Sequence, residues 1–321
     1  MKTKKLLIEL IRGLKHFEST TNMVYTTKTL SLIYFLFFFF GMEFYSSAQI
    51  TEQAINDSEL IYEFQLKLEE MYKNDKSGLA SFELLNQQLS SRKSLQWKPD
   101  EVLLKQDLDG PALYKQAAKA SLVFGKLATR KDKPGKFYLF LASSFAVGSD
   151  GICITNYHVI HEIPSSENTY TFVAAAVMNY KGEVYPVTEV LASSKKNDLA
   201  IFKVGGIDKG LDIFPLRRKV LVGEDIATIS HPFNHLRVML YNYTSGIVNR
   251  LSTSEKKELR MNISAEYAPG SSGGAIFDNR GNLVGVISTL FLMQDSKKQT
   301  LMLVKEAIPV QALWELFQTE E

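Results

Sequence analysis

The spacing of hydrophobic residues changes at about residue 120, from a helical period to short apolar runs. Within residues 51–92 apolar side chains recur three and four positions apart, with Glu and Lys between them, which predicts two amphipathic helices. We expect a break at Asn74 to Gly78, a linker at Trp97 to Asp100 and a short helix over 110–119. The periodic positions are Ile55, Leu60, Ile61, Phe64, Leu68 and Met71, then Leu79, Phe82, Leu85 and Leu89.

From residue 121 onward short β-rich runs alternate with turn residues. Many short strands at regular spacing predict an all-β fold made of barrels or sandwiches. No internal repeat is visible, and neither a G-x-G-x-x-G nor a P-loop motif, which would indicate nucleotide binding, occurs in the chain. The predicted strands cover residues 121–127, 137–147, 151–155, 170–177, 184–191, 199–204, 226–230, 237–248, 259–265, 274–277, 283–290 and 300–308.

The N-terminus has the layout of a secretory signal peptide. An uncharged apolar block at 30–42 follows Lys28 and precedes the small residues Ser46 to Ala48, so we predict cleavage between Ala48 and Gln49. The block is shorter than the roughly 20 residues of a membrane span, although an uncleaved anchor is the alternative. Met23 is a second candidate start. We therefore expect an exported protein, periplasmic or extracellular.

The net charge and the cysteine content exclude several kinds of partner and of chemistry. The net charge is +2, from 37 basic and 35 acidic residues, which gives no reason to expect nucleic acid or an anionic membrane as a partner. The one cysteine, Cys153, cannot form an intrachain disulfide. It lies between Ile152 and Ile154, so we interpret it as a small buried hydrophobe and not as a reactive thiol. No motif indicates a cofactor.

A serine flanked by glycines is the sharpest chemical feature, in the stretch Pro269-Gly-Ser-Ser272-Gly-Gly274. A serine hydroxyl needs a base to become a nucleophile, and the oxyanion formed by its attack needs N–H donors. Glycines allow the backbone to turn such N–H groups inward. The stretch therefore indicates Ser272 as nucleophile, with the amides of Gly270 and Ser272 as the oxyanion hole, although flexible loops share this composition.

The order of the candidate partners excludes one class of hydrolase. The serine motif also fits the G-x-S-x-G elbow of α/β-hydrolases, whose histidine follows the serine in the chain. No histidine lies after Ser272 here. The base must therefore lie upstream, in the order His, Asp, Ser. His158 follows an apolar run, and Asp198 directly precedes another, where a partly buried carboxylate would orient the imidazole.

With these residues in order, the chain resembles the trypsin-like serine proteases, and among them the HtrA/Deg family. The resemblance covers about residues 115–310 and implies two six-stranded antiparallel β-barrels, with His158 and Asp198 on the first, Ser272 on the second and the cleft between them. The matching stretches are Ser143-Ser-Phe145, Gly151-Ile-Cys-Ile-Thr-Asn-Tyr-His-Val159, Asn197-Asp-Leu-Ala-Ile-Phe202, Val222-Gly-Glu-Asp-Ile-Ala-Thr-Ile229, His231-Pro-Phe233, Thr244-Ser-Gly-Ile-Val248, Pro269-Gly-Ser-Ser-Gly-Gly-Ala275, Asn282-Leu-Val-Gly-Val-Ile287 and Ala307-Ile-Pro-Val310.

Three departures from that family change the expectations. Because eleven residues follow Val310, we expect no PDZ domain of the kind that HtrA-type proteases usually carry after the protease. The family's Asn-Pro-Phe reads His231-Pro232-Phe233, and His231 with His235 has an H-x3-H spacing. Pro232 breaks the helix that a metal pair at this spacing needs, so we predict no metal site. The helical residues 51–92 have no counterpart in the family.

The resemblance also implies where a specificity pocket lies, just before the nucleophile and on the strand after it. Glu266 falls where trypsin-like enzymes place an acidic pocket base, which suggests Lys or Arg at the P1 position of the substrate. The alternative is a surface glutamate beside an apolar pocket. The candidate pocket residues are Glu266, Tyr267, Ile287, Ser288 and Leu290.

We therefore predict a signal peptide at 1–48, a helical extension with its linker at 49–110, and a trypsin-like protease domain at 111–321. The predicted activity is endopeptidase cleavage of polypeptides, with unfolded proteins as the substrate class. The alternatives are a catalytically silent binding or chaperone-like module and an enzyme acting on small esters, which no feature favours. Three roles are open for the helical extension: an oligomerisation arm, a pro-segment, or packing against its own domain, which amphipathic helices most often do.

Overall fold

The computed structural model describes residues 54–74, 78–99, 102–162, 169–233, 237–254 and 258–317. The predicted signal peptide and its cleavage site lie outside these residues, as does His235. Within the described residues, no helix combines the length and the apolar character that crossing a membrane requires. Asn56 to Glu321 form one compact unit, which contains both β-barrels.

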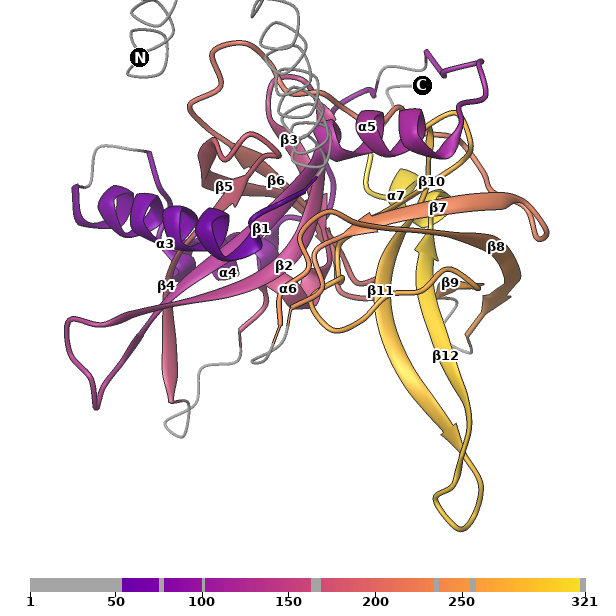
Figure 1. The fold of residues 1–321 in the computed structure, drawn as a ribbon. Helices are drawn as coiled ribbons and strands as arrows, with labels where there is room; N and C mark the ends of the chain where they lie inside the picture. Colours follow the sequence, from indigo (N-terminus) through magenta and orange to yellow (C-terminus); the bar gives the residue numbers. More distant parts are fainter. Residues whose placement is uncertain are drawn as a thin grey trace, which may run out of the picture. The chain divides into compact units, whose positions relative to one another are not determined.

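The first β-barrel contains six antiparallel strands in the order β1-β2-β3-β6-β5-β4 (Figure 1). Sequence neighbours β1 and β2 pair from Ser121 with Phe145 to Thr129 with Phe137. The pairing of β1 with β4 closes the barrel. The strands are β1 (Ser121–Arg130), β2 (Phe137–Gly148), β3 (Ile152–Thr155), β4 (Tyr170–Met178), β5 (Val184–Ser194) and β6 (Leu199–Val204).

The second β-barrel repeats this arrangement with the order β10-β11-β12-β9-β8-β7. The two barrels confirm the predicted all-β, trypsin-like architecture, and every predicted strand is present. The largest differences are in two strands: the strand expected at 237–248 runs over 242–253, and the strand expected at 283–290 continues to Gln294. The strands are β7 (Asp225–Ser230), β8 (Asn242–Thr253), β9 (Leu259–Ile263), β10 (Ala275–Phe277), β11 (Leu283–Gln294) and β12 (Thr300–Pro309).

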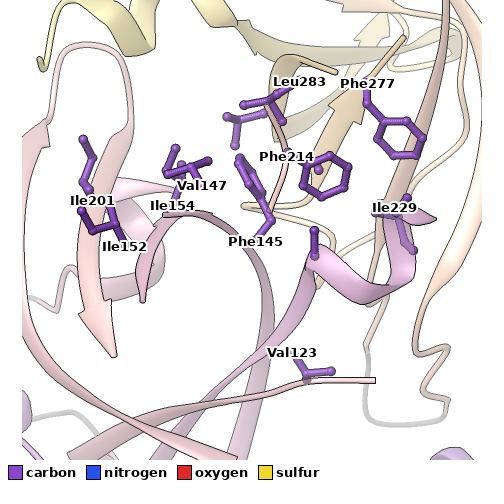
Figure 2. Close-up of a cluster of buried hydrophobic side chains, with 14 of the residues drawn as sticks. Val123, Phe145, Val147, Ile152, Ile154, Ile201, Phe214, Ile229, Phe277 and Leu283 are labelled. Carbon is purple, nitrogen blue, oxygen red and sulfur yellow. The ribbon is translucent and has the colours of Figure 1, made fainter. Parts of the chain in front are cut away.

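A row of aromatic rings joins the two barrels. Phe214, on the segment connecting them, packs edge-on against Phe145 of β2 with ring centroids 5.7 Å apart, and stacks on Phe277 of β10 at 5.3 Å. Figure 2 shows Phe214 between the other two rings. All three side chains are almost completely buried. Because buried aromatic pairs contribute both apolar area and a preferred geometry, this row fixes how the barrels face each other.

The predicted helices form and pack on the first barrel. The first two are α3 (Asp57–Asn74) and α4 (Phe82–Ser91). Phe64 of α3 is fully buried over Gly125 of β1, where an added Cβ would lie 2.6 Å from its ring. Ser81 caps α4 by accepting the Leu84 N–H. Both helices thus pack on the first barrel, and the roles of a pro-segment and of an oligomerisation arm stay predictions.

Two short helices and the cysteine complete the fold. Helix α5 (Gly110–Ala120) matches the helix expected at 110–119, with Asp109 as its N-cap, and α7 (Val310–Trp314) follows β12. Cys153 of β3 is fully buried, as predicted, and burial raises the pKa of its thiol. A protonated, inaccessible thiol is a packing residue and not a nucleophile.

Candidate active site

The structure brings His158 and Asp198 together. His158 lies on the single helical turn α6 (Tyr157–Ile160) after β3, and Asp198 ends the turn between β5 and β6. The imidazole Nδ1 lies 2.9 and 3.0 Å from the two carboxylate oxygens of Asp198. The backbone N–H of His158 donates to the same carboxylate at 3.0 Å. These contacts fix both the position of the ring and the nitrogen that faces the carboxylate.

Asp198 adopts an uncommon backbone conformation to make these contacts. Its φ is +54°, in the left-handed region, where a non-glycine residue is disfavoured. The side-chain amide of Asn156, the N-cap residue of α6, donates to the Asp198 carbonyl at 3.0 Å and holds that conformation. Side chains of Asn and Asp tolerate this region best. The position therefore accepts few residue types other than the one that is present.

Ser288 of β11 connects this pair to the second barrel. Its hydroxyl donates to Asp198 Oδ2 at 2.7 Å, which is a short, charge-assisted hydrogen bond. Its backbone carbonyl accepts the hydroxyl of Ser272 at 3.1 Å. Ser288 is one of the predicted pocket residues, and the structure adds its contact with Asp198. The two residues lie 90 positions apart, so no local sequence signal could reveal the contact.

Ser272 lies in the loop before β10 and belongs to the same network through Ser288. Among the described residues, no hydrogen bond joins its hydroxyl directly to His158. Hydrogen bonds between catalytic groups are often long or misaligned in unliganded sites and tighten when substrate is bound. His158, Asp198 and Ser272 are thus gathered around Ser288, with the serine hydroxyl turned toward the carbonyl of that residue.

The backbone of the loop that carries Ser272 requires its glycines. Gly270 and Gly273 have φ angles of +93° and +85°. A Cβ at Gly270 would overlap the backbone N of Phe233, and one at Gly273 would overlap the Ser143 carbonyl. The Phe233 N–H donates to the Pro269 carbonyl at 2.8 Å. Because the carbonyl and the following N–H of a trans peptide point in opposite directions, this bond turns the Gly270 N–H away from Phe233.

Ser143 of β2 holds the other side of the loop. Its backbone N–H donates to the Ser272 carbonyl at 2.9 Å, and its hydroxyl donates to the Gly270 carbonyl at 3.0 Å. The same hydroxyl accepts the His231 N–H at 2.8 Å. The carbonyls of Pro269, Gly270 and Ser272 are therefore all occupied. Among the described residues, the N–H groups of Gly270 and Ser272 have no acceptor, which suits a pair of donors waiting for an anionic oxygen.

Comparison with known proteins identifies the fold family of this region. Residues 142–286 match the family described as a trypsin-like peptidase domain. The chain contains a trypsin-like peptidase domain. It is 28% identical over 147 residues to the uncharacterized protein y4bJ of Sinorhizobium fredii, covering 46% of this chain and 21% of that protein. It is 26% identical over 191 residues to a probable periplasmic serine endoprotease, DegP-like, of Pseudomonas putida, covering 58% and 36%.

A solved structure agrees with this assignment at the level of the fold. The HtrA-type protease AlgW with decapeptide superposes with a TM-score of 0.50 and 20% sequence identity, covering 64% of this chain and 66% of that one. The match to the two curated relatives spans only about a fifth to a third of their own length. The peptidase domain is thus homologous to those of HtrA- and DegP-type serine proteases, as its sequence motifs had indicated.

Within the peptidase domain, His231 is a structural residue. It is fully buried, its Nδ1 accepts the Tyr241 N–H at 3.0 Å, and Nε2 lies 3.1 Å from the Ser121 hydroxyl. Accepting at Nδ1 assigns the ring proton to Nε2. Burial lowers the pKa of His231 to about 3, so the ring is neutral. Both ring nitrogens thus have partners inside the peptidase domain, the Tyr241 N–H and the Ser121 hydroxyl. We therefore interpret the ring as a structural group and not as a ligand-binding one.

The predicted pocket residues of the peptidase domain lie in different environments. The Glu266 carboxylate is largely exposed and forms an ion pair with Lys305. The Tyr267 hydroxyl lies 2.9 Å from both the Thr289 and the Glu306 carbonyls, which braces β11 against β12. Ile287 is fully buried in the core of the second barrel, and Leu290 is half-buried against that core.

A cavity of about 610 Å³ lies away from this site, between residues 103–107 and the turn after β10. It contains none of the predicted site residues. Its charges largely satisfy one another, since Arg217 pairs with Glu224 at 2.7 Å and Arg280 with Asp107 at 2.7 Å. These charged side chains already bind one another, so we do not interpret the cavity as a binding site on its volume alone.

Proposed function

We propose that this protein is a serine endopeptidase in which Ser272 is the nucleophile, His158 the general base and Asp198 the residue that orients His158. The observation that carries the proposal is the hydrogen-bonded His158–Asp198 pair, joined through one residue, Ser288, to a serine in a loop with two unengaged N–H groups. A base with its orienting acid beside a serine and anion-binding amides is the arrangement that acyl transfer requires.

The proposed reaction has two steps. Ser272 Oγ leaves the Ser288 carbonyl and attacks the carbonyl carbon of the scissile bond, while His158 Nε2 takes its proton. The N–H groups of Gly270 and Ser272 stabilise the oxyanion, and His158 then protonates the leaving amine as the C–N bond breaks. Water, deprotonated by His158, hydrolyses the acyl-enzyme and regenerates the serine. Asp198 keeps Nδ1 protonated throughout, so that Nε2 is free to act as the base.

The proposed substrates are polypeptides, with unfolded proteins as the class. Support comes from the relatives: one is named a periplasmic serine endoprotease, and the HtrA-type protease AlgW was solved with a decapeptide. The same relative and the apolar N-terminal block support export through a cleaved signal peptide. Assembly into oligomers through the N-terminal helices remains part of the proposal and rests on no contact described above.

For the P1 side chain we propose an apolar preference in place of Lys or Arg. An acidic pocket base must keep its charge available to the substrate, whereas the Glu266 carboxylate is exposed and already paired with Lys305. Tyr267 and Leu290 offer ring and aliphatic surface instead. A panel of peptides that differ only at P1 should be cleaved faster after Val or Leu than after Lys. Faster cleavage after Lys would restore the acidic-pocket interpretation.

Covalent labelling tests the nucleophile directly. A fluorophosphonate should react with the mature chain, forming a bond between phosphorus and Ser272 Oγ with loss of fluoride, and mass spectrometry should locate the adduct on the peptide that contains Ser272. Ser272→Ala and His158→Ala should both abolish the adduct, because the first lacks the attacking oxygen and the second lacks the base. Absence of labelling in the wild-type chain would favour the alternative, a silent binding module.

A further inference from the structure

The N-terminal segment of residues 80–97, which contains α4, completes the open edge of strand β5. β4 pairs with only the first three residues of β5. Beyond them, the Ala80 N–H donates to the Val187 carbonyl at 3.1 Å. The Val190 N–H donates to the side-chain carbonyl of Gln88 at 2.8 Å. The segment therefore takes the place of a neighbouring strand along this edge of β5.

The same segment fixes the end of β5, just before the turn that carries Asp198. The Ser193 N–H donates to the Arg92 carbonyl at 2.9 Å, and the Ser193 hydroxyl donates to the Leu89 carbonyl. The Arg92 guanidinium donates to the Val190 carbonyl at 2.7 Å. Ser193 is buried, and β5 ends at the next residue. The start of the turn that positions Asp198 thus depends on where the N-terminal segment holds Ser193.

The N-terminal segment reaches the Asp198 turn a second time, through residues near the C-terminus. The Leu95 N–H donates to the Leu316 carbonyl at 2.8 Å. The neighbouring Glu315 carboxylate accepts the side-chain amide of Asn197 at 2.8 Å. Asn197 directly precedes Asp198 and is almost completely buried. Because a buried amide that loses its acceptor destabilises the fold, this bond restricts the turn from its other side.

Helix α4 also contacts the element that carries His158. The Asn86 side chain accepts the Glu162 N–H at 3.1 Å, just after α6 ends. Leu85 of α4 is fully buried in the same hydrophobic cluster as Ile160 of α6. One helix therefore supports both the turn of helix that carries His158 and the strand that leads to its carboxylate partner.

We propose that the N-terminal segment is a positioning element that holds the His158–Asp198 pair in its active geometry. The proposal rests on the endopeptidase function proposed above and concerns the regulation of the same site: the active form retains residues 80–97, and loosening them lowers activity. An inhibitory pro-segment would have to cover the imidazole, whereas the His158 side chain is 46% exposed. The segment instead contacts the elements that carry the pair, and small displacements of catalytic groups cost rate.

Two alanine variants test the two routes. Asn86→Ala removes the acceptor next to α6, and Glu315→Ala removes the acceptor of the Asn197 amide. Each should lower kcat for a short peptide, and the rate of fluorophosphonate labelling of Ser272, at least about 10-fold. KM should change by no more than about 2-fold, because substrate binding is not what these contacts support. The conservative variants Asn86→Asp and Glu315→Gln keep an accepting oxygen and should restore most of the rate.

Gln65→Ala is the matched control. The Gln65 side chain donates to the Phe137 carbonyl at 3.3 Å and joins α3 to the start of β2, a bond that reaches neither α6 nor the Asp198 turn. The control also removes one hydrogen bond between the N-terminal helices and the first barrel, so its labelling rate should stay near that of the wild type. Urea unfolding of every variant measures the stability that each substitution costs.

Proton NMR of Ser272→Ala makes the test independent of turnover. The Nδ1–H of His158, donated to Asp198, should give a low-field signal that is absent from His158→Gln. Adding Asn86→Ala or Glu315→Ala should weaken or broaden this signal, because the hydrogen bond between the two side chains is no longer held in one geometry. Adding Gln65→Ala should leave the signal unchanged.

The outcomes separate the positioning role from the endopeptidase function. Unchanged labelling with an unchanged NMR signal in Asn86→Ala and Glu315→Ala would overturn the positioning role, even if Ser272 is labelled and peptides are cleaved. Faster labelling in these variants would assign the segment to inhibition, and an equal loss in Gln65→Ala would reduce it to packing; either result overturns the proposal. A wild type that is never labelled, with a signal that both variants lose, would overturn the endopeptidase function alone.

Discussion

Among single residues, Asp198 is the most constrained side chain of the candidate site. It combines a left-handed backbone with hydrogen bonds from the His158 imidazole, the His158 N–H and the Ser288 hydroxyl. A non-glycine residue in this region costs about 1–3 kcal/mol, which surrounding contacts must offset. Such strain is common where a geometry serves function. The donors around Asp198 supply the offset and set the orientation of His158 at the same time.

The first prediction concerns Ser288. Ser288→Ala removes one donor to the Asp198 carboxylate, and a hydrogen bond to a charged group contributes about 1.5–3 kcal/mol, so kcat/KM should fall by roughly 10- to 100-fold. A double-mutant cycle measures whether the effect passes through Asp198. In an Asp198→Ala background the Ser288 substitution should have little further effect on kcat/KM. Full additivity of the two losses would show that Ser288 acts through the substrate and not through Asp198.

The second prediction concerns the buried ring of His231. Its pKa is about 3 in the folded protein, against an ordinary value near 6.5. A lowered folded pKa means that the unfolded chain binds the proton first, so the free energy of unfolding falls as pH drops from about 6.5 toward 3. Between pH 7 and 5 this contributes a loss of about 2 kcal/mol.

Urea unfolding at pH 7 and pH 5 measures this loss. His231→Asn should be less stable than the wild type at pH 7 but should lose about 2 kcal/mol less on acidification. Ser121→Ala, which removes the hydroxyl beside Nε2 and keeps the histidine, is the control and should retain most of the pH dependence. Identical pH dependence in His231→Asn and the wild type would contradict the assignment of a neutral buried ring.

At the scale of elements, strand β2 and the loop that carries Ser272 act as one unit. Ser143 of β2 engages the carbonyls of Gly270 and Ser272, and Thr155 of β3 donates to the Ser143 carbonyl at 2.8 Å. The next residue on β2, Ser144, donates instead to the Leu122 carbonyl of β1 at 3.1 Å, away from the loop. Two adjacent buried serines thus have separate tasks: one orients the loop and the other joins strands.

The third prediction uses this pair. Ser143→Ala releases the Gly270 carbonyl and weakens the alignment of the Gly270 N–H, so kcat should fall by about 10-fold or more with a smaller change in KM. Ser144→Ala should lower the free energy of unfolding by about 1–3 kcal/mol with kcat nearly unchanged. Steady-state kinetics and urea unfolding of both variants give the comparison. An equal loss of kcat in the two would reduce the role of Ser143 to packing.

Physical reasons explain why the sequence pattern misplaced the start of β8 and missed the end of β11. Residues 238–241 are apolar and suggested the start of a strand, but Tyr241 has a φ of +54° and Val238 forms an isolated bridge with Phe233. Contacts around His231 fix that segment. The extension of β11 was missed because both its faces are apolar and exposed, so residues 291–294 lack the alternation by which half-buried strands are recognised.

At the scale of the whole molecule, the docking of two barrels assembles the candidate site. The order His158, Asp198, Ser272 could be predicted from short stretches of sequence, since each residue has a local context. Ser288 and Ser143 could not, because their partners lie on the opposite barrel, 90 and 127 residues away. The row Phe145, Phe214, Phe277 holds the barrels in the arrangement that brings these partners within hydrogen-bond distance.

The most direct test of the account is digestion of an unfolded protein such as casein by the chain that begins at Gln49, beside Ser272→Ala. The proposed mechanism predicts that the first cleaves casein and that Ser272→Ala loses activity on the order of 10⁶ in kcat, as removal of a serine nucleophile does. Digestion that continues at the wild-type rate in Ser272→Ala, in a preparation free of other proteases, would contradict the assignment of Ser272 and with it the proposed function.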